Sequence, residues 1–141
     1  MQIKLNMAGV KSAENLWQKV PDDVYKFRVV EVEDNPPKDA NSAPWSRVTL
    51  LICEGELAEI RQIQHSLSWG DSSRPFVKVF LEAFTNIEWD QDDMDINTEE
   101  LVNLEGYGMT KTSAYPKKDG TTGTKSEIDH FIVNLDTPVP V

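Results

Sequence analysis

Residues 46–53 (SRVTLLIC) and 60–69 (IRQIQHSLSW) decide the fold class of this chain. In each run, apolar and polar side chains alternate with the period of two that a β-strand requires. The first run places Val48, Leu50 and Ile52 on one face. The second places Ile63, His65, Leu67 and Trp69 on one face and four neutral polar residues (Gln62, Gln64, Ser66 and Ser68) on the other. Two adjacent strands, each with one apolar face, indicate a sheet that covers a core on one side.

The flanking sequence adds three strands and one helix. Residues 24–33 form a β-branched and aromatic run, and the prolines at 36 and 37 end it. The apolar residues after Pro75 recur at helical spacing to Phe84. Residues 106–115 and 125–135 predict two final strands, joined by a glycine-containing hairpin loop.

Three strands, one helix and two strands in about 110 residues predict a small all-β protein with one helix. We interpret this order as a five-stranded OB-fold barrel, with the helix between the third and fourth strands closing one end. The alternative is an open α+β sheet, which gives the same local pattern. In the first strand the buried face switches midway, which predicts a β-bulge.

The chain of 141 residues is long enough for one domain, and we assign 1–141 to it. Residues 1–20 form a leader segment, in which 13–19 have weak helical character after Ser12, and 136–141 form a proline-containing tail. Cys53 is the single cysteine, so an intrachain disulfide is excluded and a reducing cytoplasm is expected. No signal peptide or membrane span is expected either.

The net charge of −10 is concentrated in one part of the chain. Nine acids and no Lys or Arg fall between Glu82 and Glu105, which leaves 15 acids and 14 bases elsewhere. Such a balance excludes a protein that binds duplex DNA through bulk positive charge. It leaves room for a local binding surface in the near-neutral remainder.

Four stretches together resemble a known protein group. They are VPDDVYKF at 20–27, VTLLICEG at 48–55, FLEAF at 80–84 and EELVNLEGYG at 99–108. This pattern is similar to bacteriophage OB-fold single-stranded DNA-binding proteins, over roughly residues 20–135. The resemblance implies a role in phage DNA replication, recombination or repair, in the cytoplasm of the host cell. Asp23, where such proteins often have glycine, and the glutamates at 56 and 59 depart from the pattern, as does a C-terminus without an acidic tail.

Binding of single strands without sequence preference requires aromatic rings that stack on bases and cations that follow the phosphates. Trp45 and Arg47 begin the second strand, on the face opposite its aliphatic residues. Tyr107, Lys111 and Tyr115 share one face of the fourth strand. The stretch 111–125 holds four lysines against one acid, Asp119. The expected DNA-binding residues are Trp45, Arg47, Lys111, Tyr115, Lys117, Lys118, Lys125 and Tyr107, with Arg28 and Arg61 as weaker candidates.

Each of these residues has a structural alternative. Trp45 could cover the mouth of a barrel, and the lysines of 111–125 could simply lie exposed on a solvated hairpin. Trp69 is expected to pack in the core or at the end of the barrel, and Trp17 and Trp89 receive no role.

Catalysis and metal binding find little support in the sequence. His65 and His130 are isolated on strands, Cys53 has no sequence-local partner, and no phosphate-binding glycine loop occurs. The acidic stretch from Asp90 to Glu100 fits the EF-hand loop in neither register, because glycine is missing at the turn position. We expect no enzyme activity, no cofactor and no metal.

The sequence therefore predicts a sequence-nonspecific single-stranded DNA-binding protein whose acidic stretch keeps DNA to the opposite side. Its partners would be single-stranded DNA and phage replication or recombination proteins, and the sequence is compatible with a homodimer. The alternative function is an OB-fold protein-interaction module that uses the acidic residues of 88–105 and binds no nucleic acid.

Overall fold

The computed structural model of the protein describes residues 1–12, 14–92 and 94–134. It contains five strands, β1 (Val24–Asn35), β2 (Trp45–Ile52), β3 (Gln62–Ser68), β4 (Glu105–Pro116) and β5 (Thr122–Ile132). One α-helix, α1 (Arg74–Thr85), lies between β3 and β4, preceded by a 3-10 turn, η1 (Asp71–Ser73). A second 3-10 turn, η2 (Thr98–Leu101), precedes β4. The predicted all-β architecture with one helix is confirmed.

The strands form one antiparallel sheet in the order β3-β2-β1-β4-β5. The long first strand pairs with both β2 and β4, and its register shifts between Val29 and Glu31, which confirms the predicted bulge. The two edge strands, β3 and β5, come close together, but no β3–β5 ladder exists in the described residues. The sheet is therefore curved and open along this seam, and the closed barrel of the sequence prediction is not shown.

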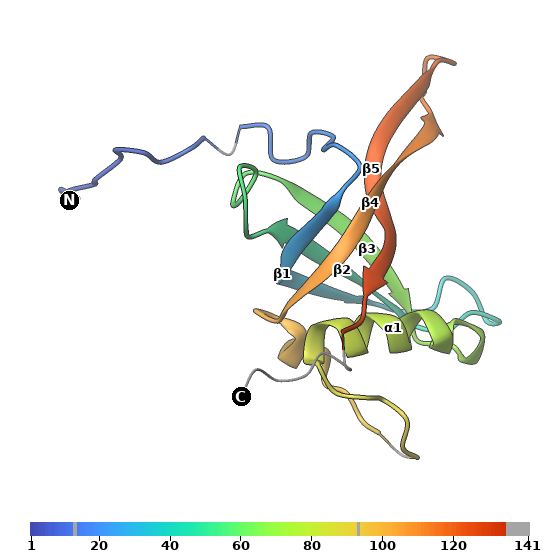
Figure 1. Ribbon diagram of the computed structural model, residues 1–141. Helices are drawn as coiled ribbons and strands as arrows, with labels where there is room; N and C mark the ends of the chain where they lie inside the picture. Colours follow the sequence, from blue (N-terminus) through green and yellow to red (C-terminus); the bar gives the residue numbers. More distant parts are fainter. Residues whose placement is uncertain (13, 93, 135–141) are drawn as a thin grey trace.

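The core lies inside the curve of the sheet, and α1 covers one end of it, opposite to the end from which the β4–β5 hairpin projects (Figure 1). Val48, Leu50 and Ile52 are completely buried, as their alternation predicts. The helix contributes Phe80 and Phe84, which stack with ring centroids 4.7 Å apart. Because Phe131 of β5 meets both rings edge-on, the helix is fixed against the last strand.

The helix also sits tightly on the start of β4. A Cβ atom at Gly106 would lie 2.9 Å from the carbonyl oxygen of Ala83 and 3.0 Å from the Phe84 ring. This close approach explains why the second residue of β4 is a glycine.

The leader segment contains turns over 14–17 in place of the helical turn expected after Ser12, and Ala13 lies outside the described residues. Among the described residues, no helix is long and apolar enough to span a membrane.

Candidate nucleic-acid interface

Trp45 lies between two cationic side chains on the outer face of the sheet. The Nζ atom of Lys38 is 5.1 Å from the centroid of the Trp45 ring, and the Cζ atom of Arg47 is 5.5 Å from it. Both distances fall within the range of cation–π attraction. No carboxylate in the described part of the chain lies within 4 Å of either cation. The predicted pair Trp45 and Arg47 is thus brought together, with a third member from the β1–β2 loop.

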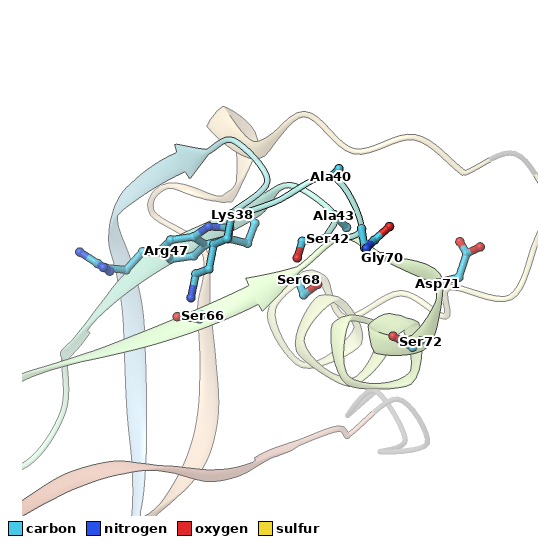
Figure 2. Close-up of a pocket in the computed structure, with 12 residues that line it drawn as sticks. Lys38, Ala40, Ser42, Ala43, Arg47, Ser66, Ser68, Gly70, Asp71 and Ser72 are labelled. Atoms are coloured by element: carbon cyan, nitrogen blue, oxygen red, sulfur yellow. The ribbon is translucent and has the colours of Figure 1, made fainter. Parts of the chain in front are cut away.

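These residues form one wall of a surface groove of about 860 Å³. Loop residues 38–43 fold over the start of β2, and Ser66 and Ser68 of β3 form the floor beside them (Figure 2). The far end is formed by residues 70–72, where Asp71 is paired with Arg74 at 2.9 Å. The groove thus combines an aromatic ring, two cations and neutral hydroxyl groups, which are the groups a single strand needs.

The groove continues into the outer face of β3. Ile63 and Leu67 point into the core, so Gln62, Gln64, Ser66 and Ser68 point outward, as their alternation predicts. Trp45 is paired with Ser68 and Arg47 with Ser66 across the β2–β3 ladder. The side chains along this face are neutral amides and hydroxyls, which can donate and accept hydrogen bonds without repelling phosphate.

The β4–β5 hairpin carries the second group of candidates, separated from Trp45 by the length of β3. Tyr115 faces Gly123 across the hairpin, where a Cβ atom would lie only 2.7 Å from the tyrosine ring and from Lys117 Cε. The phenol end of the Tyr115 ring therefore lies over the glycine, with 38% of the residue exposed. Lys118 and Lys125 are exposed on the same hairpin.

Asp119 is held within the hairpin tip, where its carboxylate accepts hydrogen bonds from the backbone N–H and hydroxyl of Thr121. These bonds lower the pKa of Asp119. Asp119, the one acid of the basic stretch 111–125, therefore points toward the backbone of its own loop.

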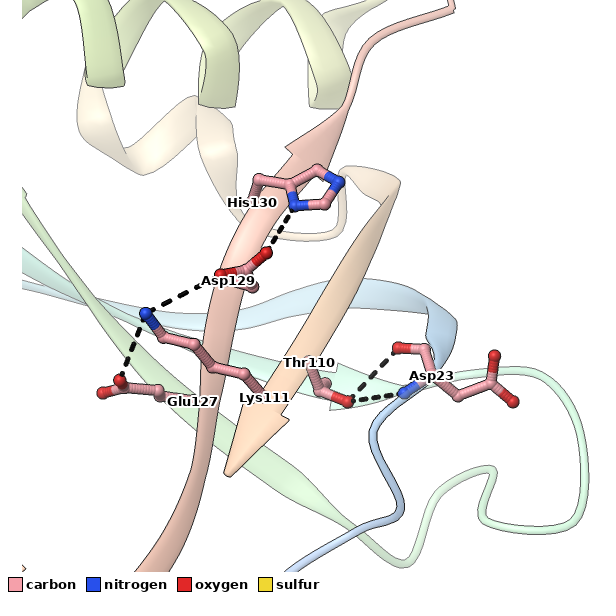
Figure 3. A network of polar contacts seen from close by, with 6 residues as sticks. All are labelled: Asp23, Thr110, Lys111, Glu127, Asp129 and His130. Atoms are coloured by element: carbon pink, nitrogen blue, oxygen red, sulfur yellow. Dashed lines mark hydrogen bonds and ion pairs between the residues drawn. The ribbon is translucent and has the colours of Figure 1, made fainter. Parts of the chain in front are cut away.

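Lys111 differs from the other hairpin lysines because its ammonium already forms ion pairs within the protein. Its ammonium lies 3.7 Å from carboxylates of both Glu127 and Asp129 on β5, and Asp129 also contacts His130 (Figure 3). The His130 contact, more than Lys111, lowers the pKa of Asp129. Lys111 is thus a poor candidate for a phosphate contact.

Tyr107, Arg28 and Arg61 do not join either group. Tyr107 lies on β4 beside Lys26 of β1, which is paired with Glu54 and Glu105. Arg28 forms an ion pair with Glu59 at 3.0 Å, and this bond raises the pKa of the arginine. Arg61 turns back to donate to the carbonyl of Ile60, and its Nε atom is buried without a hydrogen-bond partner in the described residues.

The sequence prediction missed Lys38 and Trp17. Lys38 lies in an irregular loop between two prolines, where strand periodicity gives no direction for a side chain. Trp17 lies in the leader, yet it lines a second groove with Gln62, Gln64 and Lys125.

The acidic stretch borders another groove, on the side of α1. Trp69, Trp89, Met94 and Ile96 line it together with Asp92 and Asp95, and Arg74 and Lys78 come from the helix. Trp69 packs against the core and donates its indole N–H to Ser46, so the expected packing role is confirmed. Asn97 caps η2 by accepting from the backbone N–H of Glu99, and Asp93 lies outside the described residues.

The described residues contain no cluster of three or more His, Cys, Asp and Glu placed to hold a metal ion. Burial raises the pKa of the Cys53 thiol, which works against a reactive thiolate. Burial also lowers the pKa of His65, whose ring meets Phe131 edge-on at 5.0 Å. The surroundings of the Cys53 thiol and the His65 ring thus fit a structural role.

No protein-family model matches the chain, and no curated protein matches it.

Proposed function

We propose that this protein binds single-stranded DNA without sequence preference, along the outer face of β2 and β3. The observation that carries the proposal is Trp45, with the cations Lys38 and Arg47 on its ring and no carboxylate pairing them in the described residues. Stacking of one base on such a ring contributes ~1–3 kcal/mol, and cations beside it can hold the adjoining phosphates.

The topology supports the same proposal. An OB fold is a five-stranded, partly open Greek-key barrel that binds oligonucleotides on strands 2 and 3, between the loops that follow strands 1 and 4. Here β1 pairs with β2 and β4, α1 follows β3, and the open seam lies between β3 and β5. We therefore interpret the curved sheet as an OB fold, with Lys38 in the first of these loops and Lys117 and Lys118 in the second.

The charge distribution is compatible with this surface. The groove at Trp45 and the row on β3 carry few acids, whereas Asp92 and Asp95 lie toward α1. A protein of this kind would cover exposed strands during phage DNA replication or recombination and protect them from hairpin formation and nucleases. No catalytic step is part of the proposal.

The direct test is fluorescence anisotropy of labelled dT12 at low salt, with a duplex of equal length as competitor. Trp45→Ala should weaken binding of dT12 by about 5- to 150-fold, the factor that corresponds to one lost stack. Phe76→Ala on α1 is the matched control, because Phe76 is 75% exposed and does not line the groove. Absence of binding by the wild type, or equal affinity of Trp45→Ala, would contradict the proposal.

A second candidate function rests on the groove beside α1. Its aromatic and aliphatic lining, bordered by Asp92 and Asp95, suits a basic, partly apolar segment of another protein. In that case the chain would be an interaction module, and oligo-dT would leave its tryptophan fluorescence unchanged.

A further inference from the structure

The leader segment lies against both edges of the open seam between β3 and β5. The backbone N–H of Gln62, the first residue of β3, donates to the carbonyl of Leu16 at 2.8 Å. On the other side, the backbone N–H of Val20 donates to the hydroxyl of Ser126 in β5 at 2.8 Å, and that hydroxyl donates back to the Val20 carbonyl at 3.2 Å. Val20 itself is buried in the core. Residues 16–20 are therefore anchored at both ends across the seam.

Trp17 projects from this anchored segment into solvent. It remains 59% exposed, so its ring contributes little to the core. It borders a groove of about 240 Å³ whose other walls come from Gln62 and Gln64 of β3 and from Lys125 of β5. An exposed indole on a fixed backbone, with amides and an ammonium beside it, has the groups that bind a nucleotide.

This groove and the groove at Trp45 lie at opposite ends of one polar row. Gln62 and Gln64 line the first, and Ser66 and Ser68 line the second. The row runs six residue steps from Gln62 to Ser68, or about 20 Å at the rise of a β-strand. A strand stacked as in B-DNA covers that length with about six nucleotides, within the footprint of a single OB fold.

We propose that Trp17 and Lys125 form a second base-stacking and phosphate-binding subsite, for the same DNA strand that Trp45 holds at the other end of β3. This inference rests on the proposed function, and it assigns the leader a direct part in binding. One acid, Glu127, also lines this groove, but its carboxylate lies 3.7 Å from the Lys111 ammonium. Lys111 thus partly compensates the negative charge of Glu127, which a phosphate bound in this groove would face.

The test compares dT12 with dT4, because a stacked tetramer covers only about two thirds of the row and cannot reach both grooves at once. Trp17→Ala should weaken dT12 by about 5- to 150-fold and dT4 much less, so that the gain in affinity with length shrinks. Trp17→Phe, which keeps an aromatic ring, should restore most of the loss. Phe76→Ala serves again as the control, and far-UV circular dichroism checks that each variant is folded.

If Trp17→Ala does not fold, Lys125→Gln gives the same comparison, with Lys4→Gln as its control, because Lys4 is exposed and lines neither of the two grooves. Binding of dT12 that depends on Trp45 but is unchanged by Trp17→Ala or Lys125→Gln would overturn this inference and leave the proposed function intact. Equal losses for dT4 and dT12 would also overturn it. Failure of wild-type protein to bind dT12 would overturn both.

Discussion

The ammonium of Lys38 lies 5.1 Å from the centroid of the Trp45 indole, although six residues separate the two in the chain. The β1–β2 loop therefore folds back onto the strand that follows it and delivers a cation to the aromatic ring. Arg47 approaches the same ring from the next outward position of β2. The proposed DNA-binding surface depends on this arrangement of Lys38, Trp45 and Arg47.

Arg47 and Arg28 should differ in their effect on the salt dependence of DNA binding. For a single strand, each cation that contacts a phosphate adds about 0.7 to the magnitude of the negative slope of log K, the logarithm of the binding constant, against log salt concentration. Arg47→Gln should therefore reduce the slope by about 0.7. Arg28→Gln should leave it unchanged, because Arg28 is already paired with Glu59. Equal slopes for the two variants in titrations of labelled dT12 would argue against a phosphate contact at Arg47.

Ser46→Ala should destabilise the fold by about 1–3 kcal/mol, because it leaves two polar groups without their partner. The Ser46 hydroxyl donates to Asp34 at 2.6 Å and accepts from the Trp69 indole N–H at 2.8 Å, and the residue is almost fully buried. Urea unfolding measures the loss. Ser66→Ala, on the exposed face of the neighbouring strand, is the control and should stay within about 0.5 kcal/mol. Equal losses of stability in Ser46→Ala and Ser66→Ala would show that the hydrogen bonds of Ser46 make no specific contribution to stability.

His65 should make stability depend on pH between neutral and mildly acidic conditions. Burial lowers its pKa in the folded state, so the unfolded chain binds a proton first as the pH falls below about 6.5. The free energy of unfolding should then decrease, until the pH reaches the folded-state pKa and the loss levels off. In His65→Leu this decrease should be absent between pH 7 and about 5. Thermal or urea unfolding of both proteins measures it, and parallel pH profiles would contradict the assignment.

The acidic stretch should repel DNA at long range. Replacing Asp90, Asp92, Asp93 and Asp95 together by asparagine should raise the affinity for oligo-dT at low salt. The effect should fade at higher salt, because charges more than about 10 Å apart are screened at 0.1 M. Anisotropy titrations at two salt concentrations measure the difference. An affinity that does not change at low salt would leave protein binding as the better explanation of this stretch.

Most of the sheet could be predicted from the sequence, because strand alternation and proline positions are local signals. Val48, Leu50 and Ile52 are fully buried as expected, and the bulge in β1 lies where its apolar face switches. The pairing of β1 with β4 and the curvature that brings β3 near β5 depend on distant contacts. Periodicity carries no information about such contacts.

The residues of the proposed binding surface were predictable only in part. Trp45 and Arg47 lie on a regular strand, so alternation gave their direction correctly. Lys38 lies in an irregular loop, and Trp17 is placed by backbone hydrogen bonds to β3 and β5 that no local pattern encodes. Lys111 and Arg28 illustrate a different limit, because their acidic partners come from elsewhere in the chain. A count of positive charges cannot reveal that they are already paired.

The central claim is that Trp45 binds single-stranded DNA, and intrinsic tryptophan fluorescence tests it most directly. Oligo-dT should quench the emission of the wild-type protein, more weakly at about 200 mM salt than at about 50 mM. Trp45→Ala should bind more weakly and lose the share of this quenching that comes from Trp45, whereas the remainder comes from Trp17, and Trp45→Phe should keep part of the affinity. Unchanged emission of the wild-type protein at low salt, or full quenching in Trp45→Ala, would contradict the account.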